Sequence, residues 1–106
     1  MIRPIQAEGD IADAYSEPLA LIYKHSPTCP ISAGARRHVV KFADAHPDVP
    51  IFEVDVLTNR PLSRRIESEL DIKHESPQAI VVHKGSPVWN ASHHRITAEV
   101  LAEHTM

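Results

Sequence analysis

The chain has 106 residues, 42% hydrophobic and 24% charged, which matches the size and composition of one globular domain spanning residues 1–106. A net charge of -3, with no basic cluster larger than Arg36-Arg37 or Arg64-Arg65, argues against nucleic acid as a partner. No apolar run approaches the roughly 18 residues of a membrane span, and MIRPIQAEGD lacks the apolar stretch of a signal peptide, so we expect a cytoplasmic protein without membrane contact.

The N-terminal quarter predicts a helix between two strands. Ile2–Ile5 is a weak candidate for an edge strand, and Asp10 is a candidate cap for a short helix over residues 11–16. Residues 19–23, LALIY, are a short apolar run followed by polar turn residues. This pattern is typical of a central strand that is buried on both faces.

Two amphipathic helices follow in the middle of the chain. From Pro30 to about His46, apolar residues recur every three or four positions, and the helix should end there because proline disfavours helix in the preceding residue. Residues 51–56, IFEVDV, predict the next strand. Pro61 suits a first helical turn, and the apolar stripe behind it predicts a second helix.

The C-terminal part predicts a hairpin and a last helix. AIVVH and VWNA are apolar runs joined by HKGSP, in which Lys84-Gly85 indicates a tight turn, and Thr97 could cap a short helix. The order is therefore β-α-β-α-β-α-β-β-α. Strands that alternate with helices are expected to be parallel and the hairpin antiparallel, giving an α/β fold whose central mixed sheet has helices on both faces.

Cys29 stands in TCPIS, after the central strand and before the helix that Pro30 opens. Unpaired N–H groups and the positive end of the helix dipole favour a thiolate at this position, and the thiolate is the reactive form. The preceding turn, ending at Thr28, is expected to leave the sulfur accessible. A single cysteine cannot form an internal disulfide, so the alternative is a small buried core residue without chemistry.

Ser32 lies three residues after Cys29, where dithiol oxidoreductases carry a resolving cysteine. A hydroxyl cannot close a disulfide, so a mixed disulfide on Cys29 would have to be released by an external thiol. This is a monothiol mechanism. The alternative for Ser32, compatible with the first, is a polar residue that helps to satisfy N–H groups in the first helical turn.

Several motifs resemble known redox proteins. TCPIS resembles the TCPYC of glutaredoxins without its second cysteine, and Ser76-Pro77 before a strand resembles the cis-proline loop of the thioredoxin superfamily. The combination of KHSPTCPIS, VDV, IKHESPQ and VWNASHHRIT is similar to the YtxJ-type monothiol bacilliredoxins. This resemblance implies a thioredoxin-like fold in which Cys29 takes bacillithiol from mixed disulfides on oxidised, S-thiolated proteins and then loses it to another thiol or a reductase. It implies no bound cofactor, with bacillithiol or a similar low-molecular-weight thiol as co-substrate.

The resemblance also assigns roles within the motifs. Cys29 is the nucleophile, Ser32 takes the resolving position, and Pro77 is the expected cis-proline facing Cys29. Ser76 would offer its backbone N–H and C=O to an extended substrate, as a strand edge does. The alternative is that Pro77 begins a strand in trans, the commoner state of X-Pro bonds.

Four further residues flank these motifs. Lys24 and His25 are candidates for favouring the thiolate or binding an acidic thiol, although solvated side chains at a strand end are the alternative. His74 and Glu75 are candidates for proton transfer, or equally a pair on a surface loop. The remaining histidines lack metal-ligand spacing, so no metal site is assigned.

Two other functions remain open at this point. The first is an iron–sulfur carrier in which two protomers share a cluster, although the monothiol glutaredoxins that do this have glycine where this chain has Pro30. The second is a thioredoxin-like binding module in which Cys29 is incidental and the proline loop docks a partner.

Overall fold

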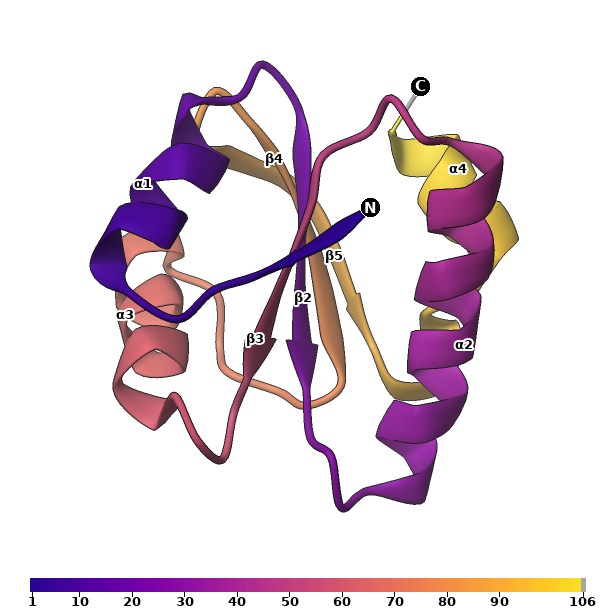
Figure 1. The fold of residues 1–106 in the computed structure, drawn as a ribbon, viewed down its shortest axis with the longest axis horizontal. Coiled ribbons are helices and arrows are strands. Elements are labelled where there is room, and N and C mark those ends of the chain that lie inside the picture. Colours follow the sequence, from indigo (N-terminus) through magenta and orange to yellow (C-terminus); the bar gives the residue numbers. More distant parts are fainter. Residues whose placement is uncertain (106) are drawn as a thin grey trace.

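In the computed structural model, which describes residues 1–105, one mixed five-stranded sheet has helices on both faces (Figure 1). The strand order is β1-β3-β2-β4-β5, with β2 at the centre. The predicted α/β architecture is confirmed. The elements are β1 Ile2–Pro4, α1 Glu8–Ser16, β2 Ala20–His25, α2 Pro30–Ala45, β3 Ile51–Asp55, α3 Arg60–Leu70, β4 Gln78–His83, β5 Ser86–Ser92, the 3-10 turn η1 His93–Arg95, and α4 Ala98–His104.

The three N-terminal strands are parallel, as predicted. β3 pairs with β1 on one side and with β2 on the other, so β1 is the edge strand expected at the N-terminus. β2 begins one residue later than predicted and continues to His25. Because β2 and β3 run in the same direction, both end at the same edge of the sheet, and the segments leading into α2 and α3 leave from that edge (Figure 1).

One expectation about strand direction was wrong. β4 alternates with helices in the sequence but runs antiparallel to β2. After α3 the chain returns along the molecule before it enters the sheet, so β4 begins at the edge where β2 ends (Figure 1). The predicted hairpin of β4 and β5 is confirmed. Its turn residues Lys84 and Gly85 both have positive φ, 51° and 81°, a conformation that suits the tight hairpin turn expected there.

The helix ends follow local chemistry, with one correction. Asp10 is not the cap of α1, because the helix already begins at Glu8 and Asp10 lies in its first turn. There its carboxylate accepts the backbone N–H groups of Gln6 and Ala7 at 2.8 and 3.0 Å. Thr97 caps α4 as predicted, since its Oγ1 accepts the N–H of Val100 at 3.2 Å.

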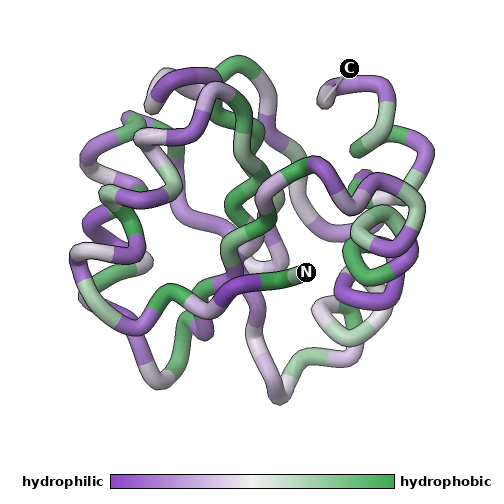
Figure 2. Tube along the Cα trace, turned by 45° about the horizontal axis from the view of Figure 1, so that its top comes forward, coloured by the Kyte–Doolittle hydropathy of each residue, from purple (hydrophilic) through white to green (hydrophobic). Residues whose placement is uncertain are grey.

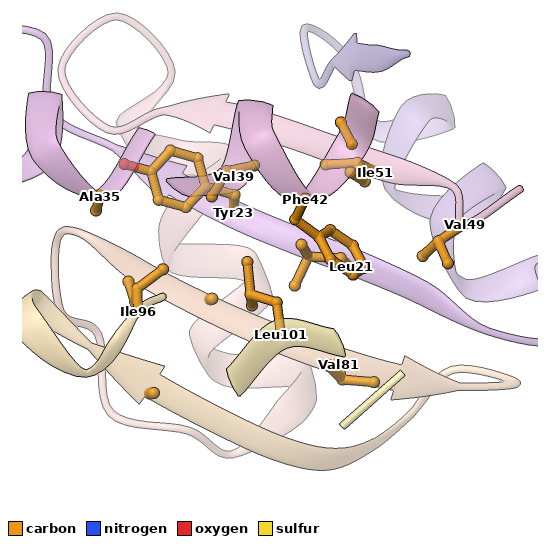
Figure 3. Close-up of a cluster of buried hydrophobic side chains, with 13 residues drawn as sticks. Leu21, Tyr23, Ala35, Val39, Phe42, Val49, Ile51, Val81, Ile96 and Leu101 are labelled. Atoms are coloured by element: carbon orange, nitrogen blue, oxygen red, sulfur yellow. The ribbon is translucent and has the colours of Figure 1, made fainter. Parts of the chain in front are cut away.

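Two apolar layers hold the helices on the sheet. In one, α2 and α4 pack on the sheet face formed by Leu21, Tyr23 and their neighbours (Figure 3). In the other, α1 and α3 pack on the face formed by Ala20, Ile22 and their neighbours. Side chains of a strand alternate between faces, so β2 supplies both layers and is apolar over most of its length, as the hydropathy along the trace shows (Figure 2). The layer of α2 and α4 is the one that positions Cys29.

Candidate active site

Cys29 is the N-cap residue of α2, with extended backbone angles of φ -101° and ψ 122°. The turn from β2 is closed by its backbone N–H, which donates to the carbonyl of Ser26 at 3.2 Å. Thr28 and Pro30 on either side are exposed, and Cys29 itself is a partly exposed free thiol. Pro30 occupies the start of the helix, where a missing N–H breaks no helical hydrogen bond. The cysteine is therefore accessible, and the structure contradicts the alternative of a buried core residue.

The first turn of α2 stabilises the thiolate. The pKa of Cys29 is lowered mainly by the backbone N–H of Ser32, which donates to the sulfur, and further by the N–H of Ile31 and the hydroxyl of Ser32. Partial desolvation opposes these effects. Because N–H groups of a first helical turn have no partner within the helix, they are free to bind an anionic sulfur.

Ser32 is held in place by burial and by two hydrogen bonds. It is fully buried. Its Oγ accepts the backbone N–H of Ser26 at 3.3 Å, and its carbonyl oxygen accepts the hydroxyl of Tyr23 at 3.0 Å. Ser32 is thus a fixed support of the cysteine turn, and the N–H group that its side chain accepts belongs to the loop before α2 instead of the first helical turn.

A polar network lies beneath this turn. The single hydroxyl hydrogen of Tyr23 goes to Ser32, so Nδ1 of His25, 3.2 Å from the same oxygen, is the donor in that contact. Burial lowers the pKa of His25 and raises that of Tyr23, so the ring and the hydroxyl are both favoured in their neutral forms. Arg36 of α2 donates two hydrogen bonds to Glu53 of β3, at 2.7 and 3.2 Å, and so ties the helix to the sheet.

The proline loop enters the sheet at the same edge. The Ser76-Pro77 peptide bond is cis, and Pro77 is buried. The carbonyl oxygen of Pro77 accepts the N–H of His93 at 3.2 Å, which links this loop to the end of β5. The next residue, Gln78, pairs with Lys24 of β2, so the loop begins where the cysteine turn begins. The Oγ of Ser76 is buried and has no hydrogen-bond partner within residues 1–105.

The structure does not bring Lys24 to the cysteine's side of the sheet. Lys24 is fully buried, so it is not a solvated side chain at a strand end. It alternates with Tyr23 and lies in the layer of α3, where Nζ is 3.1 Å from Nδ1 of His74. Burial lowers the pKa of Lys24 to about 8.

His74 belongs to the Lys24 side as well. Its Nδ1 is also 3.3 Å from Oγ of Ser63, and its backbone N–H donates to Glu67 at 2.6 Å. Burial and the charge of Lys24 lower the pKa of His74. The backbone N–H of Glu75 donates to Oε1 of Gln78 at 3.4 Å, so Gln78 supports the loop. Both histidine and glutamate are half-buried rather than on an open surface loop.

Two supporting residues, Tyr23 and Gln78, had no role assigned from the sequence. Tyr23 and His25 are spaced by two on a strand and share a face, which was the available signal. Gln78 is a polar residue at the start of an apolar strand, and its Nε2 donates to the carbonyl of Lys73 at 3.0 Å. Gln78 is buried because the loop of residues 73–77 folds back over it, and the local sequence pattern does not predict this arrangement.

Neither a metal centre nor a membrane-spanning helix occurs among the described residues. Within that part of the chain, no three His, Cys, Asp or Glu side chains are grouped so as to hold a metal ion. Over residues 1–105, no helix is both long and apolar enough to cross a membrane.

Solved structures similar to this chain have the thioredoxin fold. A protein described as a candidate oxidoreductase with a thioredoxin fold is 32% identical, with a TM-score of 0.89 over 96% of this chain and 91% of the other. Fasciola hepatica thioredoxin is 17% identical, with a TM-score of 0.77 over 97% and 95%. Trypanosoma brucei brucei thioredoxin is 15% identical, with a TM-score of 0.79 over 97% and 86%. The expected thioredoxin-like fold is confirmed.

The family model described as "Monothiol bacilliredoxin BrxC" matches residues 3–101, nearly the whole chain. This agrees with the resemblance to YtxJ-type monothiol bacilliredoxins found in the sequence motifs. Together with the fold and an accessible single cysteine, it supports a function in thiol redox chemistry. The chain belongs to the monothiol bacilliredoxin BrxC family.

Proposed function

We propose that the protein is a monothiol thiol–disulfide oxidoreductase in which Cys29 removes bacillithiol, or a similar low-molecular-weight thiol, from mixed disulfides on proteins. The observation that carries the proposal is the placement of the only cysteine. Its sulfur is accessible at the start of α2, and the N–H and hydroxyl of Ser32 lower its pKa. An accessible thiolate is the nucleophile that disulfide exchange requires.

In the first step the Cys29 thiolate attacks the sulfur of the small thiol in the client's mixed disulfide. The S–S bond of the client breaks, and the client cysteine leaves as a thiolate that takes a proton from water. A new S–S bond joins Cys29 to the small thiol. The client is reduced and Cys29 is oxidised, so no electrons enter or leave the pair.

The second step needs an external thiol. No other cysteine exists in the chain, and Ser32 at the resolving position cannot form a disulfide. A second thiolate therefore attacks the small thiol's sulfur, carries it away as a disulfide, and restores the Cys29 thiolate.

The cis-proline loop is proposed to dock the disulfide substrate. Ser76 precedes Pro77 where β4 begins, and its backbone groups would pair with an extended segment of the client, as a strand pairs with a sheet edge. Neither step uses a bound cofactor. The compartment that fits this cycle is a reducing one such as the cytoplasm, where free thiols are available for the second step.

Intact mass spectrometry tests the proposed function. A test protein carrying one bacillithiol or glutathione mixed disulfide is mixed with the purified enzyme under anaerobic conditions. The small thiol's mass should move to wild-type protein, and Cys29→Ser should leave the test protein modified because serine forms no disulfide. Circular dichroism of Cys29→Ser serves as the folding control. A well-folded wild type that takes no adduct from either substrate would overturn the proposal.

A further inference from the structure

A groove of about 450 Å³ lies directly beside the cysteine turn. It is formed by the first turns of α2 on one side and by the segment after β5, which approaches α2 (Figure 1), on the other. The polar side chains of its lining are basic, and the other lining residues are apolar or glycine. The lining residues are Pro30, Ile31, Gly34, Ala35, Arg37, His38, His93, His94 and Ile96.

Arg37 reaches back towards the cysteine. A Cβ placed on Gly34 would lie 3.6 Å from Nη2 of Arg37, so the guanidinium lies over the preceding turn of α2. Side chains on a helix lean towards its N-terminus, which here is Cys29. Within residues 1–105, Arg37 forms no ion pair, so its charge is available to a ligand.

Two of the three groove histidines, His38 and His93, make hydrogen bonds with the backbone of other segments. Nδ1 of His38 accepts the N–H of Ala98 at 3.2 Å, which leaves its hydrogen on Nε2 as a donor. His93 has a positive φ of 56°, a left-handed conformation that few residues with side chains adopt. Its N–H donates to the carbonyl of Pro77 at 3.2 Å, so the groove is built against the proline loop.

The charge of this groove opposes that of the whole chain. The protein carries a net charge of -3, yet the groove is lined by an arginine and three histidines without one carboxylate. A group that complements this lining is an anion. Because Pro30 and Ile31 of the lining directly follow Cys29, a small group attached to the sulfur is close enough to enter.

We propose that this groove binds the anionic end of the small thiol carried on Cys29, and that it selects carboxylate-bearing low-molecular-weight thiols over neutral ones. The proposal rests on the proposed function, because it concerns the mixed disulfide formed in the first step. In that step Cys29 bonds to the small thiol's sulfur while Arg37 and the histidines hold the carboxylate.

Another basic cavity, of about 210 Å³, lies on the α3 side of the sheet and fits this role less well. It is lined by Arg60, Ser63, Arg64 and His74 near the start of α3. α3 packs on the opposite face of the sheet from α2, and no residue of the cysteine turn lines this cavity. It provides a matched control, because Arg64 is also an exposed arginine on a helix beside a cavity.

The test compares two aromatic disulfide probes of similar size. Dithiobis(nitrobenzoate) carries a carboxylate on each half, whereas dithiodipyridine is uncharged at neutral pH. Cys29 attacks either probe, one half stays on its sulfur, and the other half leaves as a coloured thiolate or thione. Stopped-flow absorbance gives both rate constants, and their ratio cancels any change in the amount of thiolate.

The variants are Arg37→Gln, His93→Asn and the control Arg64→Gln. Asparagine tolerates the left-handed conformation of residue 93. Any change in the rate ratio of His93→Asn therefore reports the loss of the imidazole ring and not a strained backbone. Exposed charge pairs contribute modestly, so the rate ratio of charged to uncharged probe should fall about two- to fivefold in Arg37→Gln and in the double variant with His93→Asn. It should stay unchanged in Arg64→Gln. Added salt should lower the wild-type ratio towards that of the double variant.

Each outcome points to one conclusion. An unchanged rate ratio in the double variant, or an equal fall in Arg64→Gln, would contradict anion binding by the groove. Fast reaction with the uncharged probe would still support the proposed function in that case. If Cys29 in the wild type reacts with the uncharged probe no faster than free cysteine does, the proposed function itself fails. A selective fall in the groove variants supports both.

Discussion

At the scale of single residues, the chemistry depends on how Ser32 is used. The sequence places a hydroxyl where related dithiol proteins carry a thiol, which shows only what the residue cannot do. The structure shows a buried residue whose N–H and hydroxyl lower the pKa of Cys29, while its own oxygen atoms accept hydrogen bonds from Ser26 and Tyr23. The serine at the resolving position therefore also supports the thiolate.

The pKa of Cys29 should respond to Ser32 in a graded way. In the wild type the absorbance of the thiolate should titrate below the free-cysteine value of about 8.5, and the exchange rate should fall as the pH drops through that midpoint. Ser32→Ala removes the hydroxyl but keeps the backbone N–H groups of residues 31 and 32. The titration midpoint of its Cys29 should therefore rise only part of the way towards that of free cysteine. Cys29→Ser supplies the spectroscopic blank. A wild-type midpoint at or above 8.5 would contradict stabilisation by the helix start.

Ser32→Cys should convert the mechanism to a dithiol one. Ser32 lies in the first turn of α2, which Cys29 caps, and its hydroxyl lowers the pKa of Cys29, so we expect a thiol at this position to come within reach of a disulfide. After a bacillithiol or glutathione disulfide is added, wild type should keep the adduct until an external thiol arrives. The variant should expel the small thiol and end two hydrogens lighter by intact mass. An adduct equally long-lived in both proteins would show that residue 32 does not face Cys29.

At the scale of elements, periodicity predicted which segments are helices and strands but not every direction. The stretches around β2, α2 and β3 were placed to within a residue or two because their apolar spacing is regular. The antiparallel entry of β4 could not be predicted, since alternation with helices normally implies parallel strands. The groove beside Cys29 joins α2 to residues 93–96, and no local pattern encodes that approach.

Tyr23→Phe tests how β2 supports α2. The phenylalanine keeps the ring in the apolar layer (Figure 3) but removes the hydrogen bond to the Ser32 carbonyl. We expect a loss of about 1 kcal/mol in the free energy of unfolding by urea, together with a raised Cys29 midpoint because the cysteine turn is held less firmly. Tyr15→Phe, which removes an exposed bond to Glu69, is the matched control and should leave that midpoint unchanged. Equal Cys29 titration midpoints in wild type, Tyr23→Phe and Tyr15→Phe would show that Tyr23 contributes only packing and does not support the thiolate.

At the scale of the whole molecule, the sheet separates two chemical environments. Cys29, Ser32 and His25 belong to the α2 side, whereas the buried Lys24 and His74 belong to the α3 side. The sequence suggested Lys24 as a partner of Cys29 because the two residues are close along the chain. Successive side chains of a strand point to opposite faces of the sheet, so closeness in the chain does not bring Lys24 to the side of Cys29. The lysine therefore lies in the layer of α3, away from the thiol.

Lys24 should make stability depend on pH in the alkaline range. Burial lowers its pKa from the ordinary value of 10.5 to about 8, so between these two values the unfolded chain binds more protons than the folded one. Stability attributable to this group must then rise as the pH increases from about 8 towards 10.5, by up to about 3 kcal/mol. Lys24→Met keeps the length of the stem and removes the titration, so its free energy of unfolding should lack this rise. Urea unfolding at pH about 7 and about 9.5 gives the comparison, since that interval lies mostly between the two pKa values. Parallel behaviour of wild type and variant would mean that Lys24 keeps its ordinary pKa, and hence that its amine reaches water instead of lying beneath α3.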